Sequence, residues 1–266
     1  EYNLLGETPA HCRKLRLKHP ILTPEEIEKI RVLDQEDLKT VTLSTLFPVN
    51  EGEEGMEKAL ENLCDQASSA IEQGATILLL SDRGVDQDHA PIPSLLATAA
   101  VHHHLLREGT RMHCGIAVET GEAKEMHHFA LLIGFGAGAV YPYLAYDTIA
   151  KIASENVFIK EIAIEAAIKN FITSCRKGLY KITAKMGIST IQSYRGAQIF
   201  EAVGLSSELI DRYFIGTPSR IEGVGLEVLA REALARHRAA YESSQVLPPL
   251  LDAGGDYYWR RGEQKH

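Results

Sequence analysis

Two hydrophobic patterns alternate through the middle of the chain. From Met56 to Ile71 apolar residues recur about every 3.6 positions, which is typical of an amphipathic helix, and Gly74 ends the pattern. Residues 75–80 form an apolar run interrupted by Thr76, as in a strand buried on both faces. Such alternation of helices and strands predicts a parallel sheet with right-handed crossovers. We expect strands at 40–45, 75–80, 112–118 and 139–144, and helices between them at 56–71, 94–108 and 121–133.

The outer parts of the chain follow other patterns. Residues 1–24 read as an extended lead-in, followed by a short helix over 24–33 in which Thr23 is the N-cap and Glu26 completes a capping box. Beyond residue 143 the pattern turns helical. Further helices are expected at 144–153, 160–177, 179–186, 206–213 and 225–243.

These elements predict one α/β domain over residues 1–246. Four strands followed by helices do not complete an eight-stranded barrel. We therefore predict a partial or degenerate βα barrel, TIM-like, with parallel strands and a helical C-terminal half. Residues 247–266 are rich in proline and glycine and are interpreted as a linker.

Composition restricts the classes of function. An apolar content of 45% and a charged content of 24% in 266 residues are ordinary for a globular protein. The net charge of −8 argues against a nucleic-acid partner, and no apolar run is long enough to cross a membrane. Four widely separated cysteines give no zinc, redox or iron–sulfur motif, so no metal site is expected and the thiols should be free. These are Cys12, Cys64, Cys114 and Cys175.

Ligand sites in parallel α/β folds lie in the loops after the carboxyl ends of strands. Three loops have this position, at 44–55, 81–89 and 119–122. The second contains Asp82, Arg83 and His89, which suffice for acid–base chemistry or a cation site. Asp82 beside Arg83 can equally form an internal ion pair that holds a corner, and we favour that interpretation, because structural ion-pair networks shift pKa values as active sites do.

Three other motifs do not predict chemistry. The glycines of 134–138 end a helix instead of opening one, so the negative end of that helix repels phosphate. The histidines at 102–104 point about 100° apart on a helix and cannot converge on a metal ion. Glu125 and His128 have the spacing of half a dinuclear site, but no second copy is present. We predict no catalytic, cofactor-binding or metal-binding residue.

A stretch near residue 190 combines small, polar and cationic residues. Gly187 is expected to end the preceding helix in the left-handed conformation, and 188–191 to form a short β-type run. Ser193, Tyr194 and Arg195 then form a turn that presents hydroxyls and a fixed cation. The arginine either donates to backbone carbonyls or binds a ligand.

Residues 185–205 resemble the end of the central domain of glutamate synthase. The resemblance extends over nearly the whole chain, and its motifs, weak singly, are specific in this order. The sequence departs from the family pattern at Tyr141, where asparagine is expected. The remaining motifs are Asn3-Leu4-Leu5-Gly6-Glu7, His19-Pro20-Ile21-Leu22-Thr23, Ser81-Asp82-Arg83-Gly84, Ala90-Pro91-Ile92-Pro93-Ser94-Leu95-Leu96-Ala97, His127-His128-Phe129-Ala130-Leu131-Leu132-Ile133-Gly134 and Gly216-Thr217-Pro218-Ser219-Arg220.

The resemblance implies a non-catalytic domain that joins a glutamine amidotransferase domain to an FMN-binding barrel and contributes to the wall of an ammonia tunnel. In such enzymes the ammonia reacts with 2-oxoglutarate and the imine is reduced to glutamate. Electrons come from ferredoxin or a pyridine-nucleotide-dependent subunit through an iron–sulfur cluster. FMN and the cluster would belong to other parts of the parent enzyme, so this segment alone should be inactive. The implied compartment is the cytoplasm, or the plastid stroma in a plant or alga.

An ammonia tunnel needs a narrow, uncharged wall that offers hydroxyl contacts. Thr42, Ser44 and Thr45 at the end of the first strand meet this need, although threonine is also an ordinary strand residue. Two alternatives stay open: an independent small-molecule enzyme that uses loop 81–89, and a pure interaction module. The candidates for tunnel or interdomain contacts are Thr42, Ser44, Thr45, Asp82, Arg83, His89, Ser193, Tyr194 and Arg195.

Overall fold

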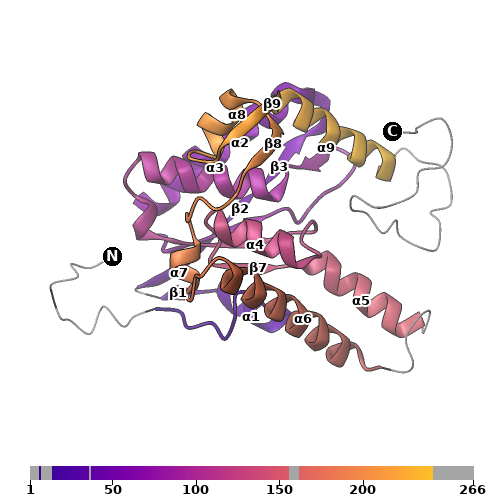
Figure 1. The fold of residues 1–266 in the computed structure, drawn as a ribbon. Helices are drawn as coiled ribbons and strands as arrows, with labels where there is room; N and C mark the ends of the chain where they lie inside the picture. The colour runs from indigo at the N-terminus through magenta and orange to yellow at the C-terminus, as the bar shows by residue number, and fades with distance from the viewer. Residues whose placement is uncertain (1–5, 7–13, 36, 156–161, 242–266) are drawn as a thin grey trace.

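A five-stranded sheet organises the chain (Figure 1). The computed structural model describes residues 6, 14–35, 37–155 and 162–241. The strands of the sheet are β1 (Asp34–Gln35), β2 (Leu38–Ser44), β4 (Ile77–Ser81), β6 (Gly115–Glu119) and β7 (Ala139–Tyr141). They follow the order β1-β2-β4-β6-β7, in which β1 is antiparallel to β2 and all later pairs are parallel. The predicted parallel α/β sheet is confirmed, and within the described residues it is open.

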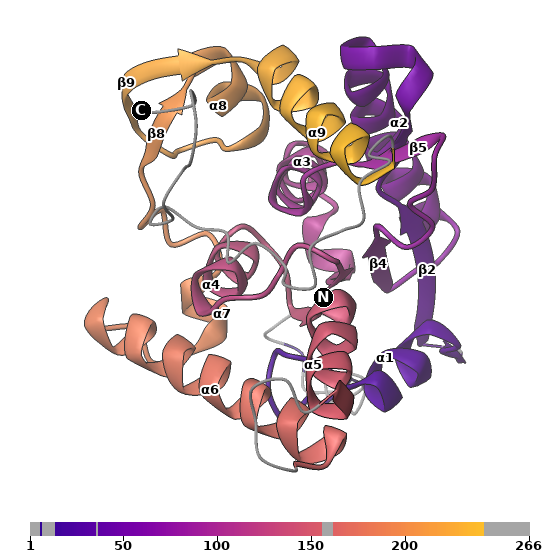
Figure 2. The same cartoon turned by 90° about the vertical axis from the view of Figure 1, so that its right-hand side faces the viewer.

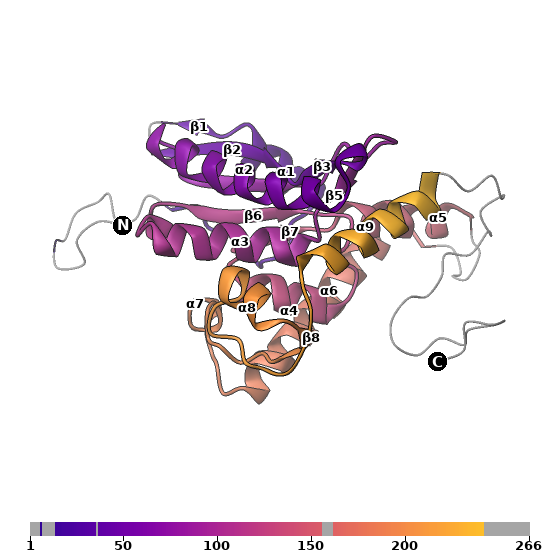
Figure 3. The ribbon, with the colours of Figure 1, turned by 90° about the horizontal axis from the view of Figure 1, so that it is seen from above.

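Three helices connect the parallel strands: α2 (Gly52–Glu72), α3 (Ser94–Arg107) and α4 (Met126–Gly134). Met56 and Leu60 are among the buried residues of α2, as the period of 3.6 predicted. Figure 3 shows α3 between α2 and the short helix α8 (Ser207–Tyr213), and α3 contacts both. The helices therefore cover the sheet as crossovers, and all five positions of β4 are buried.

Helix α4 begins later than predicted. Residues 121–125 form a loop because tertiary hydrogen bonds occupy them. The Gly121 N–H donates to Asp82, and the Glu122 carboxylate accepts the Ser94 N–H at the start of α3, at 2.6 Å. Local periodicity contains no sign of partners this distant in sequence.

Helix α1 (Pro24–Arg31) has the predicted capping box, because Thr23 Oγ1 accepts the Glu26 N–H and the Glu26 carboxylate accepts the Thr23 N–H. The lead-in before it is not simply extended chain. Ile21 forms a parallel bridge with Val140, which adds a contact to the free edge of β7.

The second half of the chain is helical, with two corrections. Helices α5 (Tyr143–Glu155) and α6 (Ile164–Lys185) follow β7, and α6 is one helix where two were predicted. Gly178 does not break it, since the glycine packs against Met126, where an added Cβ would lie 2.8 Å from that side chain. The β-type run predicted at 188–191 is wrong: residues 188–190 belong to no strand, and α7 (Ile191–Tyr194) begins at residue 191, where Thr190 Oγ1 accepts the Ser193 N–H as an N-cap.

Several short elements had no sequence signal. Two sheets of two strands form from β3 (Leu46–Pro48) with β5 (His89–Pro91), antiparallel, and from β8 (Ala202–Leu205) with β9 (Ser219–Val224), parallel. Their partners are distant in sequence, and β3 and β5 are too short for alternation to be recognised. The remaining elements are α9 (Leu226–Tyr241) and 3-10 helices at Val49–Glu51 and Arg111–His113.

The elements separate into two halves. Figures 1 and 2 show α2, α3, α8 and α9 gathered on one side with β8 and β9, and α1, α5 and α6 on the other. The linker predicted at 247–266 lies outside the described residues, so the boundary at 246 stays a prediction.

Candidate functional site

Parallel pairing aligns polar residues at the carboxyl edge of the sheet. Ser44 pairs with Ser81, Ser81 with Glu119, and Glu119 with Tyr141. Neighbours in register project to the same face, so these four residues form one row across β2, β4, β6 and β7. The loops that follow strands therefore meet at one edge, as the sequence predicted.

Glu119 is the centre of this row. Its side chain is only 1% exposed, and its Oε1 accepts from Arg31 Nη2 at 2.7 Å and from Arg83 Nε at 3.4 Å. The Ser81 hydroxyl donates to Oε2 at 2.5 Å. A buried carboxylate is costly unless it is paired and hydrogen-bonded. Here two arginines, 30% and 48% exposed, and one hydroxyl meet that requirement.

Asp82 forms a second network beside the first. It is 3% exposed, and its Oδ2 accepts the Thr120 hydroxyl at 2.7 Å and the Gly121 N–H at 2.9 Å. Burial raises the pKa of Asp82, while the bonds from Thr120, Gly121 and the Tyr143 hydroxyl act in the opposite direction. Asp82 thus ties the end of β4 to the loop after β6.

The predicted ion pair between Asp82 and Arg83 is wrong. Consecutive residues at a strand end project to opposite sides. Asp82 therefore turns toward Thr120, whereas Arg83 bonds to Glu119 and lies 3.9 Å from the centre of the Tyr143 ring. The corner predicted at this loop exists, but its arginine pairs with a carboxylate on another strand.

The rest of loop 81–89 is a solvent-exposed turn. Asp86 Oδ1 accepts the backbone N–H groups of Asp88 and His89 and lies 2.9 Å from His89 Nδ1. The hydrogen bond from His89 is the main cause that lowers the pKa of Asp86. These contacts shape the turn, and His89 does not join the Glu119 network.

The hydroxyl candidates on β2 differ in exposure. Thr42 and Ser44 are exposed, while Leu43 between them is buried. Thr45 is buried, its N–H donates to the Ser81 carbonyl, and its own carbonyl accepts the Ile92 N–H. Thr42 and Ser44 are therefore accessible for contacts outside the domain, whereas Thr45 is buried and hydrogen-bonded within the fold.

A different cluster lies at the amino end of β6 and β7. Arg111, 6% exposed, donates from Nε to His102 Nδ1 at 2.9 Å, from Nη1 to the Cys114 carbonyl at 2.7 Å and from Nη2 to the Gly136 carbonyl at 2.9 Å. Burial, and then the charge of Arg111, lower the pKa of His102 to about 3. The imidazole is therefore neutral and can accept the arginine's proton in a hydrogen bond.

Ser193, Tyr194 and Arg195 belong to this amino end and not to the Glu119 row. The Ser193 N–H donates to the α7 cap, and Tyr194 is buried. Arg195 is half-buried, and a Cβ built on Gly138 would lie 3.9 Å from its Nη1. The candidates from the sequence thus divide between two ends of the sheet. Sequence reasoning missed Arg31, Glu119 and Arg111, because no local motif marks them.

The described residues do not fit a flavin phosphate or an iron–sulfur cluster. The glycines near residue 136 follow the carboxyl end of α4, and the Gly136 carbonyl is bonded to Arg111. Cys64, Cys114 and Cys175 are buried on separate elements, and burial raises the pKa of each thiol. Cys12 lies outside the described residues. Among the residues that the structure describes, no group of three or more histidine, cysteine, aspartate or glutamate side chains could hold a metal ion.

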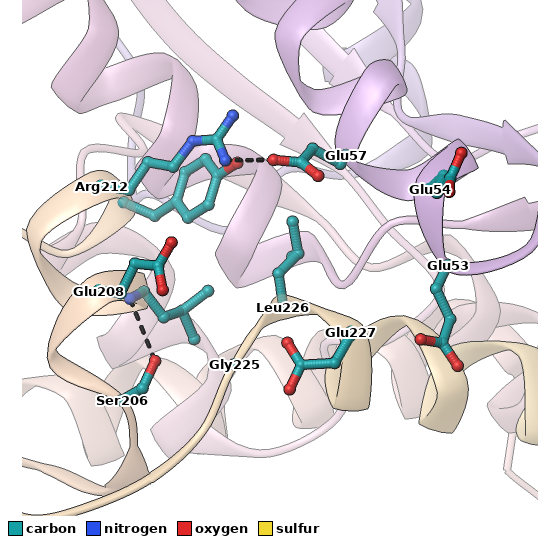
Figure 4. Close-up of a pocket in the computed structure, with 11 residues that line it drawn as sticks. Glu53, Glu54, Glu57, Ser206, Glu208, Arg212, Gly225, Leu226 and Glu227 are labelled. Carbon is teal, nitrogen blue, oxygen red and sulfur yellow. Dashed lines mark hydrogen bonds and ion pairs between the residues drawn. The ribbon is translucent and has the colours of Figure 1, made fainter.

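A pocket of about 240 Å³ lies between α2, α8 and the start of α9 (Figure 4). Arg212 projects from α8 and forms ion pairs with Glu57 and Glu61 of α2. Most other polar groups in the lining are carboxylates, which by themselves predict no ligand. The glutamates that line the pocket are Glu53, Glu54, Glu57, Glu208 and Glu227.

Comparison with known proteins gives consistent matches. The model of the family described as "Glutamate synthase central domain" matches residues 1–206. The chain is 43% identical over its 266 residues to the large chain of the NADPH glutamate synthase of Bacillus subtilis (strain 168). It is 39% identical, over 99% of its length, to the chloroplastic ferredoxin-dependent glutamate synthase of Oryza sativa subsp. japonica. It spans 17% of the length of each relative.

A solved structure also aligns with the chain, with lower sequence identity. The flavin-binding domain of baker's yeast flavocytochrome b2 covers 87% of this chain with a TM-score of 0.40 and 15% identity, and 46% of its own chain is aligned. The fold follows from the strand order of the chain itself. No helix among the described residues is long and apolar enough to cross a membrane.

Proposed function

Because the chain belongs to the family of glutamate synthase central domains, we propose that it is a non-catalytic domain that connects the two catalytic parts of a glutamate synthase. These parts are a glutamine amidotransferase domain and an FMN-binding barrel of the same polypeptide. The parent enzyme makes glutamate from glutamine and 2-oxoglutarate, with FMN and an iron–sulfur cluster outside this segment.

The observation that supports a scaffold role is that the buried carboxylates at the carboxyl edge of the sheet are bonded to other groups of the chain. Glu119 and Asp82 are the buried carboxylates of this edge, and both are saturated by groups of the chain itself. A general acid or base must reach its substrate within hydrogen-bond distance. These two carboxylates instead tie the ends of β4 and β6 to each other and to α1, which is the role of a rigid connector.

We propose that ammonia passes along the exposed hydroxyls of β2. Ser44 is a member of the edge row, in register with Ser81, and Thr42 lies two residues before it on β2. The nearby Glu119 carboxylate is engaged by Arg31 and Ser81, so it is not free to hold ammonium. Hydroxyls can accept and donate hydrogen bonds without carrying charge.

Bulky replacements in the complete enzyme test this proposal. Ser44→Phe and Thr42→Phe should reduce glutamate formed per glutamine hydrolysed, while glutaminase activity persists. These positions are preferable to Thr45, because their exposure allows a large side chain without repacking the core. Val32→Phe, at an exposed position after α1, is the matched control and should leave coupling intact. Unchanged coupling in both β2 variants would remove this strand from the tunnel.

The electron donor and compartment follow from the kind of enzyme. Among the relatives, one form is named for NADPH and another for ferredoxin, so the parent enzyme takes electrons from ferredoxin or from a pyridine-nucleotide-dependent subunit. We place it in the cytoplasm, or in the plastid stroma if the source is a plant or alga. No observation favours the alternative of an independent enzyme that uses loop 81–89, since Asp82 and Arg83 of this loop are bonded within the fold.

A further inference from the structure

Two arginines lie close together at the amino end of the sheet, and no described carboxylate forms an ion pair with either. Arg111 donates to the Gly136 carbonyl, and Arg195 Nη1 lies beside Gly138, two residues further along the chain. Burial is the main cause that lowers the pKa of Arg111 and of His102, and the charge of Arg195 acts on both in the same direction. Among the described residues, the ion pairs found include neither arginine.

Neutral groups satisfy the hydrogen bonds of Arg111. Its three nitrogens donate to an imidazole and two backbone carbonyls. The acceptor His102 is neutral, and burial raises the pKa of the neighbouring Cys114 thiol, which therefore stays protonated. A guanidinium keeps its charge in proteins. Arg111 is thus a fixed, buried positive charge, and no negative charge compensates it in the part of the chain that the structure describes.

Arg195 is satisfied far less well. Its Nη2 donates to the side-chain oxygen of Gln192, whereas its buried Nε has no acceptor among the described residues. The hydroxyl of the adjacent Tyr194 is also buried without a partner there. By contrast, Arg212, Arg220 and Arg231 all form ion pairs with glutamates.

We propose that Arg195, backed by the fixed charge of Arg111, binds an oxyanion of the carboxylate or phosphate class. The planar fork of a guanidinium matches these groups, and charge-assisted bonds to them are strong. His102, on which the charge of Arg195 acts, and Cys114, whose carbonyl is bonded to Arg111, carry no negative charge that would compete. Two sources can supply the anion: a free metabolite, or an aspartate or glutamate side chain from the remainder of the full-length polypeptide.

Nuclear magnetic resonance of the arginine Nε–H groups tests the site in the 266-residue chain. Inorganic phosphate and acetate are titrated against chloride at constant ionic strength. We expect the Arg195 resonance to shift and saturate at millimolar anion. Arg195→Lys identifies the resonance by removing it while keeping the charge, so the assignment does not depend on a variant that loses the cation. A shift that does not saturate would overturn the proposal.

Thermal melting supplies the second measurement. Phosphate should raise the Tm of the parent chain in a saturable way, and Arg195→Gln should weaken the apparent affinity at least tenfold. Arg220→Gln removes the same charge from an exposed arginine already paired with Glu201, and it should bind like the parent. Equal weakening in both variants would show a general effect of net charge and refute the site.

Modification by phenylglyoxal, followed by peptide mass mapping, distinguishes the two sources. In the isolated chain, Arg195 should react without phosphate and be protected by it. In full-length glutamate synthase, protection without any added anion identifies a carboxylate of the polypeptide. Protection that requires phosphate identifies a free ligand. Equal reactivity of Arg195 in both proteins, with and without phosphate, would refute binding of an oxyanion.

Discussion

Arg31 and Arg83, which both pair with Glu119, should stabilise the fold non-additively. Arg31→Met and Arg83→Met each remove one charge but keep an apolar stem. Because the other arginine still pairs with Glu119, each single change should cost about 1 kcal/mol, near the upper end for partly exposed ion pairs. Arg31 should cost the more of the two, since it is less exposed than Arg83 and its contact is 2.7 Å instead of 3.4 Å.

The double variant should lose much more than the sum. Glu119, 1% exposed, would then keep only the hydroxyl bond from Ser81. Leaving a buried charge without its partners costs about 3–5 kcal/mol. The coupling between the two changes should therefore be about 1–3 kcal/mol. The destabilisation of the double variant should fall sharply when Glu119→Gln is added, because the amide removes the unpaired charge.

Urea unfolding of the parent, the two single variants, the double variant and the triple variant measures this coupling. Arg220→Met is the matched control: its side chain is 73% exposed and its partner Glu201 is also exposed, so the expected cost is below about 1 kcal/mol. Costs that add to within about 0.5 kcal/mol would mean that the two arginines act independently. A triple variant as unstable as the double would show that the unpaired carboxylate is not the cause.

Two further outcomes follow from the structure. His102 has a pKa of about 3 in the fold against about 6.5 when unfolded, so its contribution to stability is present at neutral pH and is lost as pH falls from about 6.5 toward 3. Between pH 8 and pH 5 that loss is about 2 kcal/mol, and His102→Gln, which keeps an acceptor for Arg111, should lose correspondingly less in urea unfolding across the same range. The purified chain should be colourless and form no glutamate from glutamine and 2-oxoglutarate, because its glycines near 136 end a helix; stoichiometric flavin absorbance would contradict this.

Local patterns determined the elements that depend on neighbours in sequence. The capping box of Thr23 and Glu26 joins groups three residues apart, so it is visible in the sequence and present in the structure. Gly187 likewise ends α6 with a φ of 68°, where other residues would be strained. The apolar run within 75–80 gave a buried strand because burial on both faces removes the need for alternation.

The candidate site was predictable as a place but not as a set of contacts. Parallel strands bring their carboxyl ends to one edge, so the loops after β2, β4 and β6 were correctly expected to meet. Which side chains bond there depends on direction and register. Arg83 follows Asp82 in sequence, yet it bonds to Glu119, 36 residues away.

The sequence by itself determined the alternation of the central parallel strands with their crossover helices, and the family, because these depend on periodicity, caps and motif order. Only the tertiary structure decided that Arg31 reaches Glu119 across 88 residues and that Arg111 lies buried among neutral acceptors. It also separated Arg195 from the tunnel candidates of β2. The physical reason is that a charged side chain chooses its partner by distance and burial after the chain has folded, and neither quantity is contained in sequence spacing.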